Sequence, residues 1–348
     1  MSKLSSLVVS GFVLLVALSP SAHVKGESIG ELESSRVIEL ASQDQPEKVP
    51  VVSSVTLAPE GQLLATGGDD HLVRIWNADT GQVVRQLSGH TDWVRSTLFS
   101  PDGRILATAG NDRRIKLWSV SSGEPLHSWS SAEQVIYTLA FSPDGRKLAA
   151  AGFAEKVLIY DTDSGRLLRV LDAPGRDIRA LSFSPRGDQL AGAGRQGPIR
   201  IWDVATGGRL YDLEGHRRRV HALAYSPDGT RLASAGEERN VRFWNATTGE
   251  PLEILPARPG TVLTLAFCGP GRLAVGGTDN VIRLWDLAAR HEQCRLVGHT
   301  GSITSLVWNV PAGVLISGSF DTTLRLWPIA AADAEKISRS ERTTERAN

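Results

Sequence analysis

Residues 94–118 read VRSTLFSPDGRILATAGNDRRIKLW, and they contain three short strand-like runs separated by turns. The alternating run at 94–100 ends in Pro-Asp-Gly. Proline presets the first turn dihedral and glycine accepts a positive φ, so a tight hairpin is expected here. The run ILATAG is a predicted second strand, in which alanine and glycine permit close backbone approach. A polar bend then leads to a third strand that ends at Trp118. This stretch therefore predicts consecutive antiparallel strands.

The same pattern recurs along the chain at a period of 42 residues, shortened once to 41. An aromatic residue ends the third run of every unit, namely Trp76, Trp118, Tyr160, Trp202, Trp244, Trp285 and Trp327. A proline-containing turn keeps the same period, with prolines at 59, 101, 143, 185, 227, 270 and 311. A Thr-Gly or Ser-Gly pair after most of the aromatic residues predicts a turn into a fourth strand. Seven such units predict an all-β, seven-bladed β-propeller with four-stranded blades.

Charge and cysteine content exclude several classes of protein. The 348 residues include 38 basic and 38 acidic ones, a balance that argues against a nucleic-acid-binding protein or a polybasic membrane surface. Two cysteines, Cys268 and Cys294, cannot build a disulfide framework or a CxxC-type zinc site. They fall on the first and fourth predicted strands of the sixth unit, about 14 Å apart, so we expect no disulfide between them. We also expect no metal and no cofactor.

The N-terminus has the layout of a secretory signal peptide. Lys3 precedes an apolar run at 7–18, and small residues follow. The sequence thus divides into a signal peptide (1–22), a linker (23–35), a propeller (36–329) and a polar flexible tail (330–348). We expect an exported protein, periplasmic, at the cell surface or secreted. The alternative is a protein held at the membrane by an uncleaved N-terminal segment.

The last unit lacks a fourth strand of its own, because the residues after Trp327 are polar and do not alternate. Before the first unit lies RVIELA at 36–41, a strand-like run without a partner. We expect this run to pair with the strand that ends at Trp327 and so close the ring. Closure would remove an open sheet edge, which otherwise templates aggregation.

Three units carry a histidine, a hydroxyl, a carboxylate and a tryptophan at identical spacing. The sets are His90, Thr108, Asp112 and Trp118; His216, Ser234, Glu238 and Trp244; and His299, Ser317, Asp321 and Trp327. One interpretation is a hydrolase triad of nucleophile, base and orienting carboxylate. The other is a buried hydrogen-bond network. Three copies in one ring favour the network, since an enzyme needs one site, and we predict no catalytic residues here.

The repeat resembles the WD40 family. The resemblance rests on Gly-His pairs at 89–90, 215–216 and 298–299 and on Trp-Asp pairs at 202–203 and 285–286, and it covers residues 36–329. It implies seven sheets packed radially about a channel, and it assigns the four-residue sets to a structural hydrogen-bond network. The first unit keeps Thr66, Asp70 and Trp76 but has no Gly-His pair.

The resemblance also implies which residues face the narrow top opening, the usual partner surface of the family. The richest positions lie in units two to five and are Trp93, Arg95, Asn111, Tyr137, Phe153, Asp177, Arg179, Arg195, Arg219, His221 and Glu237. Tryptophan, tyrosine and arginine are typical of binding hot spots, and arginine favours carboxylate or phosphate groups.

We therefore expect a non-catalytic, monomeric interaction scaffold that binds a protein or peptide partner, acidic or phosphorylated, through this surface. The alternative is an enzyme or a small-ligand-binding propeller with a site in the central channel, for which the sequence offers His221 and Tyr137 near the mouth.

Overall fold

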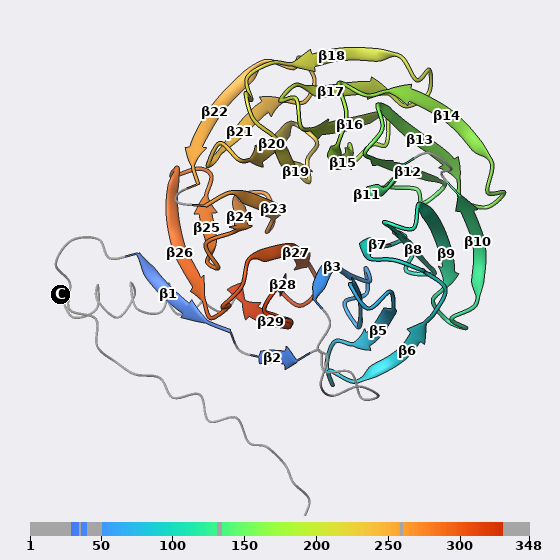
Figure 1. The fold of residues 1–348 in the computed structure, drawn as a ribbon. Coiled ribbons are helices and arrows are strands. Elements are labelled where there is room, and N and C mark those ends of the chain that lie inside the picture. Colours follow the sequence, from blue (N-terminus) through green and yellow to red (C-terminus); the bar gives the residue numbers. More distant parts are fainter. Residues whose placement is uncertain (1–28, 35, 40–50, 131–133, 258–259, 330–348) are drawn as a thin grey trace, which may run out of the picture.

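The computed structural model describes residues 29–34, 36–39, 51–130, 134–257 and 260–329. These residues form seven β-sheets arranged as the blades of a ring around a central opening (Figure 1). The seven-bladed, four-stranded propeller expected from the repeat is therefore confirmed. The signal-peptide segment 1–22 and the tail 330–348 lie outside the described residues.

Each blade runs from the channel outward through four strands in sequence order, with one exception in the last blade. The innermost strands are β3 (Val52–Leu57), β7 (Val94–Phe99), β11 (Ile136–Phe141), β15 (Ile178–Phe183), β19 (Val220–Tyr225), β23 (Val262–Phe267) and β27 (Ile303–Asn309). The second strands are β4 (Leu63–Gly68), β8 (Ile105–Gly110), β12 (Lys147–Gly152), β16 (Gln189–Gly194), β20 (Arg231–Gly236), β24 (Arg272–Gly277) and β28 (Val314–Ser319).

Each third strand ends one residue beyond the periodic aromatic residue. They are β5 (Val73–Asn77), β9 (Arg114–Ser119), β13 (Lys156–Asp161), β17 (Ile199–Asp203), β21 (Asn240–Asn245), β25 (Ile282–Asp286) and β29 (Thr323–Pro328). The outermost strands of blades one to six are β6 (Val83–Leu87), β10 (Pro125–Ser130), β14 (Leu167–Asp172), β18 (Arg209–Leu213), β22 (Pro251–Pro256) and β26 (His291–Val297).

The Pro-Asp-Gly hairpins form as the sequence predicts. In blade two, Gly103 adopts a φ of 71° and its N–H donates to the carbonyl oxygen of Ser100 at 2.9 Å. The Ser100 hydroxyl in turn donates to Asp102 Oδ1 at 2.6 Å. The local residues therefore satisfy this turn's polar groups themselves.

An N-terminal strand closes the ring. Strand β2 (Arg36–Glu39) pairs antiparallel with β29, with Ile38 opposite Leu324, and becomes the fourth strand of blade seven. Ile38 is buried in a cluster with Val55 and Trp76 of blade one. The predicted pairing is confirmed, and the bonded strand occupies the first four residues of the predicted run.

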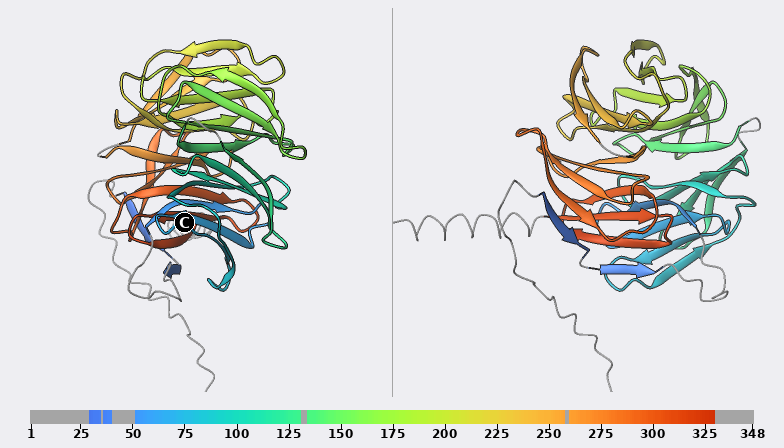
Figure 2. Two further views of the ribbon diagram at one scale, coloured as in Figure 1. Left: turned by 45° about the vertical axis from the view of Figure 1, so that its right-hand side comes forward. Right: turned by 60° about the vertical axis from the view of Figure 1, so that its left-hand side comes forward.

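A second N-terminal strand was not expected from the sequence. Residues 30–33 belong to the segment assigned as a linker, yet they form β1 (Gly30–Glu33), which pairs in parallel with β26 and gives blade six a fifth strand. Both N-terminal strands lie at the rim beside blades six and seven (Figures 1 and 2). Leu32 packs against the apolar cluster between these blades.

The core consists of apolar layers between neighbouring blades. One such layer joins Val73 and Ile75 of blade one to Leu106 and Trp118 of blade two. Cys268 and Cys294 are both buried, and no disulfide joins them. Burial raises the pKa of the Cys268 thiol to about 12.

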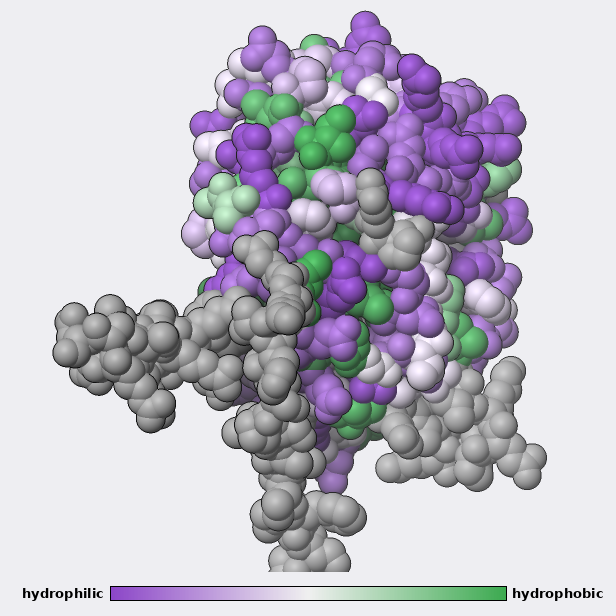
Figure 3. Space-filling view, turned by 90° about the vertical axis from the view of Figure 1, so that its left-hand side faces the viewer, coloured by the Kyte–Doolittle hydropathy of each residue, from purple (hydrophilic) through white to green (hydrophobic). Residues whose placement is uncertain are grey.

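The outer side that carries β1 is mainly hydrophilic with separate hydrophobic spots (Figure 3). Among the described residues, no helix has the length and hydropathy needed to cross a membrane.

Candidate functional site

Hydrogen bonds join all four residues in each of the three periodic sets. In blade two, the Trp118 indole N–H donates to Thr108 Oγ1 at 2.8 Å. Thr108 Oγ1 lies 2.8 Å from His90 Nε2, and His90 Nδ1 lies 2.7 Å from Asp112 Oδ2. The chain of contacts runs from the third strand, through the second strand and the loop before the first strand, to the bend. It therefore fixes four segments of one blade.

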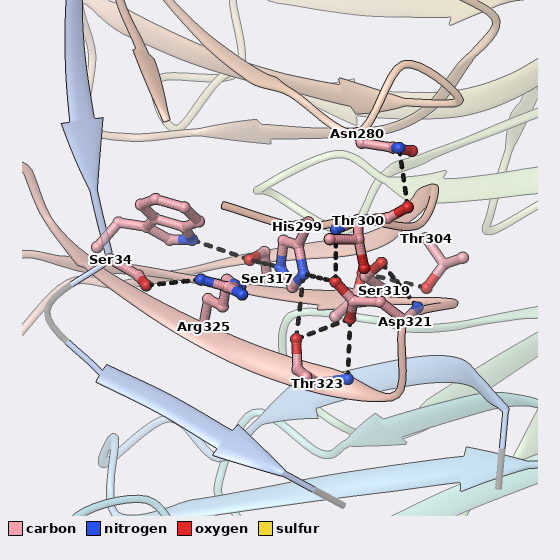
Figure 4. Close-up of polar contacts among 12 residues, drawn as sticks. Ser34, Asn280, His299, Thr300, Thr304, Ser317, Ser319, Asp321, Thr323 and Arg325 are labelled. Atoms are coloured by element: carbon pink, nitrogen blue, oxygen red, sulfur yellow. Dashed lines mark hydrogen bonds and ion pairs between the residues drawn. The ribbon is translucent and has the colours of Figure 1, made fainter. Parts of the chain in front are cut away.

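Blades five and seven repeat this geometry. The distances from His216 are 2.8 Å to Ser234 and 3.0 Å to Glu238, and Trp244 donates to Ser234 at 2.8 Å. Figure 4 shows the set in blade seven, where His299 lies between Ser317 and Asp321.

The proton positions follow from the carboxylate, which can only accept. The histidine nitrogen that faces it, Nδ1, therefore carries a proton and donates it to the carboxylate. In the neutral imidazole Nε2 is then an acceptor, so the hydroxyl, which accepts from the indole N–H, donates its own proton to Nε2. Burial lowers the pKa of His216 and His299 despite their carboxylate partners. The imidazoles of His216 and His299 are therefore mainly neutral near pH 7.

The same burial argues against a nucleophilic role. Thr108, Ser234 and Ser317 are each 0% exposed, so a substrate cannot reach their hydroxyl oxygens without opening the blade. The sets have the residue types of a triad but lack the access that nucleophilic attack needs.

Blades one and six keep the carboxylate but hold it differently. Asp70 pairs with Arg74 at 2.6 Å, and Asp279 pairs with Arg283 at 2.5 Å. Both arginines are buried. An arginine four residues after the bend carboxylate thus supplies the charge complement that histidine hydrogen bonding supplies elsewhere.

The predicted partner-binding residues of blades two to five meet around the channel mouth. We call nine of them the mouth cluster: Trp93, Arg95, Asn111, Tyr137, Asp177, Arg179, Arg219, His221 and Glu237. Seven of these flank the first residue of an inner strand, and the other two, Asn111 and Glu237, each directly precede a bend carboxylate. The cluster is joined by contacts within and between blades.

Two stacked arginines are its main feature. The Arg95 guanidinium carbon lies 4.3 Å from the centroid of the Trp93 ring, and that of Arg179 lies 3.7 Å from the Tyr137 ring. Arg95 Nε also donates to Asn111 Oδ1 at 2.9 Å. Burial lowers the pKa of Arg95, and the nearby Arg179 charge acts in the same direction. The positive charges of the two stacked guanidinium groups therefore repel each other.

Asp177 neutralises part of this positive charge. It lies 2.6 Å from Arg179 and 3.0 Å from Arg219, and Arg219 is also 3.3 Å from Glu237. Asp177 has a φ of 62°, a left-handed conformation that aspartate tolerates better than most residues. Arg179 and Arg219 thus have carboxylate partners within the chain.

His221 lies beside Glu237, with Nε2 3.8 Å from Oε1. Burial lowers its pKa, and the positive charges of Arg219 and Arg179 lower it further. The imidazole is therefore mainly neutral near pH 7. Among the described residues, no group of three or more histidine, cysteine or acidic side chains could hold a metal ion.

Two predicted partner residues stand apart from these contacts. Phe153 is 53% exposed, and several other large apolar side chains of the described residues, such as Ile254 and Val310, are exposed as well. Arg195 is exposed as well, and within the described residues it forms no ion pair. The sequence predicted both residues on the top surface. It could not show that neither takes part in the contacts that join the mouth cluster.

Sequence reasoning missed a second basic region beside the mouth. Arg217, Arg218, Arg239 and Arg242 line an open pocket between blades five and six. The signal was the run HRRRV at 216–220, in which only Arg219 was assigned to the partner surface.

This protein is a repeat β-propeller, as shown by its ring of seven sheets and its periodic hydrogen-bond sets, and the mouth cluster lies at one end of its channel. The chain belongs to the family described as WD domain, G-beta repeat, whose model matches residues 43–77, 81–119, 123–161, 165–203, 207–245, 249–286 and 291–328.

Individual relatives match over short stretches. The U3 snoRNP-associated protein-like EMB2271 of Arabidopsis thaliana is 41% identical over 66 residues, which is 19% of this chain and 14% of that protein. Coronin-7 of Homo sapiens is 42% identical over 77 residues, 20% of this chain and 8% of the relative. The probable serine/threonine-protein kinase PkwA of Thermomonospora curvata is 44% identical over 43 residues, 12% and 6% respectively. The chain thus matches less than a sixth of the length of each of these relatives.

Proposed function

We propose that this protein is a non-catalytic interaction scaffold that binds a protein partner at the mouth cluster. The observation that carries this proposal is the pair of arginine–aromatic stacks, Arg95 on Trp93 and Arg179 on Tyr137. Stacking orients each guanidinium before a partner arrives, so less side-chain entropy is lost on binding. Aromatic and arginine side chains are also the residue types that dominate interface energetics.

The partner chemistry follows from the state of each arginine. Arg179 and Arg219 already face Asp177, whereas the hydrogen-bond partner of Arg95 is the neutral amide of Asn111. Arg95 therefore keeps a charge that an incoming carboxylate or phosphoryl group can satisfy. Phe153 offers an apolar contact on the neighbouring blade. We infer an acidic partner segment with an adjacent apolar side chain.

The relatives support a binding module more than one fixed activity. Their printed names describe a ribonucleoprotein-associated protein, a coronin and a probable kinase. A repeat shared by proteins of such different names is suited to a common task of recognition. No observation favours the second candidate, an enzyme with its site in the central channel.

Export is part of the proposal and rests on the apolar run at 7–18 after Lys3. Cell fractionation and N-terminal sequencing of the mature protein test it. A mature chain that begins near residue 23 in an exported fraction supports cleavage. An intact N-terminus in the membrane fraction supports the anchored alternative, and an intact chain in the cytosol contradicts both.

The partner itself should be found by proximity labelling in the native compartment. Arg95→Glu combined with Arg179→Glu reverses two charges at the mouth, and we expect labelling of the specific partner to be lost. The matched control is Arg104→Glu with Arg146→Glu, two exposed arginines that follow the Pro-Asp-Gly turns away from the mouth. Unchanged labelling in the mouth variant would contradict the proposal.

A further inference from the structure

The pocket between blades five and six is a candidate binding site separate from the mouth cluster. We call it the five–six groove, and its lining residues are Arg217, Arg218, Glu237, Glu238, Arg239, Asn240, Arg242, Thr261 and Thr278. Its volume is about 760 Å³, within the range of small-molecule and side-chain pockets. It is formed by the loops before β19 and β23 and by the bends after β20 and β24, so both blades contribute.

Four arginines against two glutamates leave the lining with a formal charge of +2. Arg217, Arg218 and Arg239 are exposed. In the part of the chain that the structure describes, none of these three side chains makes an ion pair or a hydrogen bond. They differ in this respect from Arg179 and Arg219 at the mouth, which face Asp177.

The two glutamates are directed toward other partners. Glu238 accepts hydrogen bonds from His216 Nδ1 at 3.0 Å and from the Arg217 backbone N–H at 2.5 Å. Its pKa is lowered by these contacts although burial acts in the opposite direction. Glu237 faces Arg219 at 3.3 Å. The carboxylates therefore leave the three exposed guanidinium groups available to an external anion.

Neutral donors complete the far wall. Thr278 Oγ1 accepts the Thr261 backbone N–H at 3.0 Å, and its own hydroxyl proton can be donated to a ligand. A groove with arginine forks on one side and a hydroxyl donor on the other suits a tetrahedral oxyanion.

We propose that the five–six groove binds a phosphorylated side chain of a protein partner. A phosphoryl group carries a charge near −2 at pH 7, which matches the +2 lining and not the long run of phosphates in a nucleic acid. The groove shares Glu237 with the mouth cluster, so one extended segment can contact both. The inference rests on the proposed interaction role of this face but uses different arginines.

The test uses the full chain and three fluorescent peptide pools with randomised flanks and a fixed central residue: phosphoserine, serine or glutamate. Fluorescence anisotropy should show binding of the phosphoserine pool about tenfold tighter than that of the serine pool, because two or more charge-assisted hydrogen bonds are added. The triple variant Arg217→Gln, Arg218→Gln and Arg239→Gln should lose this preference.

The matched control removes the same charge elsewhere, as Arg104→Gln, Arg146→Gln and Arg166→Gln, all exposed and outside the groove lining. It should retain the phosphoserine preference. Equal binding of the phosphoserine and serine pools to the unmodified protein would overturn the inference, as would a preference that survives in the groove variant. Inorganic phosphate that competes at the same concentration as the peptide would show a free-anion site and overturn the peptide assignment.

Failure here is distinguishable from failure of the proposed function. Arg95→Glu with Arg179→Glu should leave the phosphoserine preference in place, because those residues do not line the groove. A protein that loses partner labelling in the mouth variant but shows no phosphoserine preference keeps its scaffold role and has no phosphate site.

Discussion

Arg36 on β2 donates a hydrogen bond from Nη1 to the backbone carbonyl oxygen of Ala78, at 3.2 Å, across the junction between blade seven and blade one. The outer strand of blade one makes the corresponding contact to blade two, where Arg85 Nε donates to the carbonyl oxygen of Val120 at 3.2 Å. The N-terminal strand therefore replaces both the missing fourth strand and its contact with the next blade. Ring closure is completed by residues from opposite ends of the domain.

The first prediction concerns the packing of this closing strand. Ile38 is 5% exposed and Val37 is 42% exposed, so two neighbouring residues on β2 test burial directly. Ile38→Ala should lower the free energy of unfolding by about 2–4 kcal/mol through lost burial and a residual cavity. Val37→Ala should change it by less than about 0.5 kcal/mol. Urea unfolding monitored by tryptophan fluorescence checks both, and equal effects would contradict the role of β2 in closure.

The second prediction concerns the hydrogen-bond sets. His90→Ala removes one hydrogen-bond partner of Thr108 and one of Asp112, whose side chains are buried. We expect a loss of about 1–3 kcal/mol in the free energy of unfolding, the cost of leaving buried polar groups unpaired. His291→Ala is the control, because His291 is exposed on β26. If partner binding falls while the unfolding curve stays in place, His90 has a role other than a structural one.

The third prediction concerns acid unfolding. Burial raises the pKa of Asp321, but hydrogen bonds from Thr323, the Thr300 N–H and His299 outweigh it and hold the pKa at about 2. Because the pKa of Asp321 is lower in the folded state, its ionised carboxylate stabilises the fold. This stabilisation is fully present above the pKa of aspartate in the unfolded chain, about 3.9. It is lost as pH falls through the folded value. His299 has a lowered pKa too, so its contribution begins to fall below about pH 6.5, where the unfolded histidine takes up a proton.

The urea midpoint should therefore decline in two steps as pH falls, one beginning below about pH 6.5 and one between about pH 4 and 2. Asp321→Asn removes the titrating carboxyl and should flatten the lower step, although it also lowers stability at neutral pH. Asp163→Asn, at an exposed turn, should leave both steps unchanged. A lower step of the same size in Asp321→Asn would show that other carboxylates dominate.

The fourth prediction concerns Asp177, which lies between Arg179 and Arg219. Asp177→Asn keeps a residue that tolerates the left-handed backbone but removes the charge that both arginines face. We expect a loss of about 1–3 kcal/mol in the free energy of unfolding, as for other groups that lose a charged hydrogen-bond partner. Salt should weaken the unmodified protein more than the variant, because screening acts on the ion pairs. Equal salt dependence of the two unfolding midpoints would contradict this.

The sequence predicted most of the fold because each blade is encoded locally. Turn residues such as Pro101 and Gly103 set the hairpins, and the periodic tryptophans set the register of seven repeats. The run at 36–41 could be recognised as the missing strand, since the last repeat lacked one. Strand β1 could not be recognised in the same way. Four residues, Gly30–Glu33, are too short a run to show a strand pattern, and their parallel pairing with β26 depends on a partner more than 250 residues away.

The candidate site also has one part that could be predicted from the sequence and one part that could not. The spacing of His90, Thr108, Asp112 and Trp118 was readable because the four residues occupy equivalent positions in several repeats. Which charged side chains pair with one another at the mouth could not be predicted from the sequence. Asp177 and Arg219 belong to different blades, and whether they pair depends on side-chain directions across the channel mouth.

The sequence by itself determined the number of blades, the strands within each blade and the residues of the hydrogen-bond sets, because those features depend on contacts inside a 42-residue repeat. Only the tertiary structure decided which arginines remain available to a partner. The sequence does not distinguish Arg95, Arg179, Arg217 and Arg219 by their availability to a partner. In the folded protein, Asp177 and Glu237 lie against Arg179 and Arg219, whereas the side chains of Arg95 and Arg217 form no ion pair with a carboxylate among the described residues. The physical reason is that electrostatic interactions depend on distance and burial, not on position along the chain.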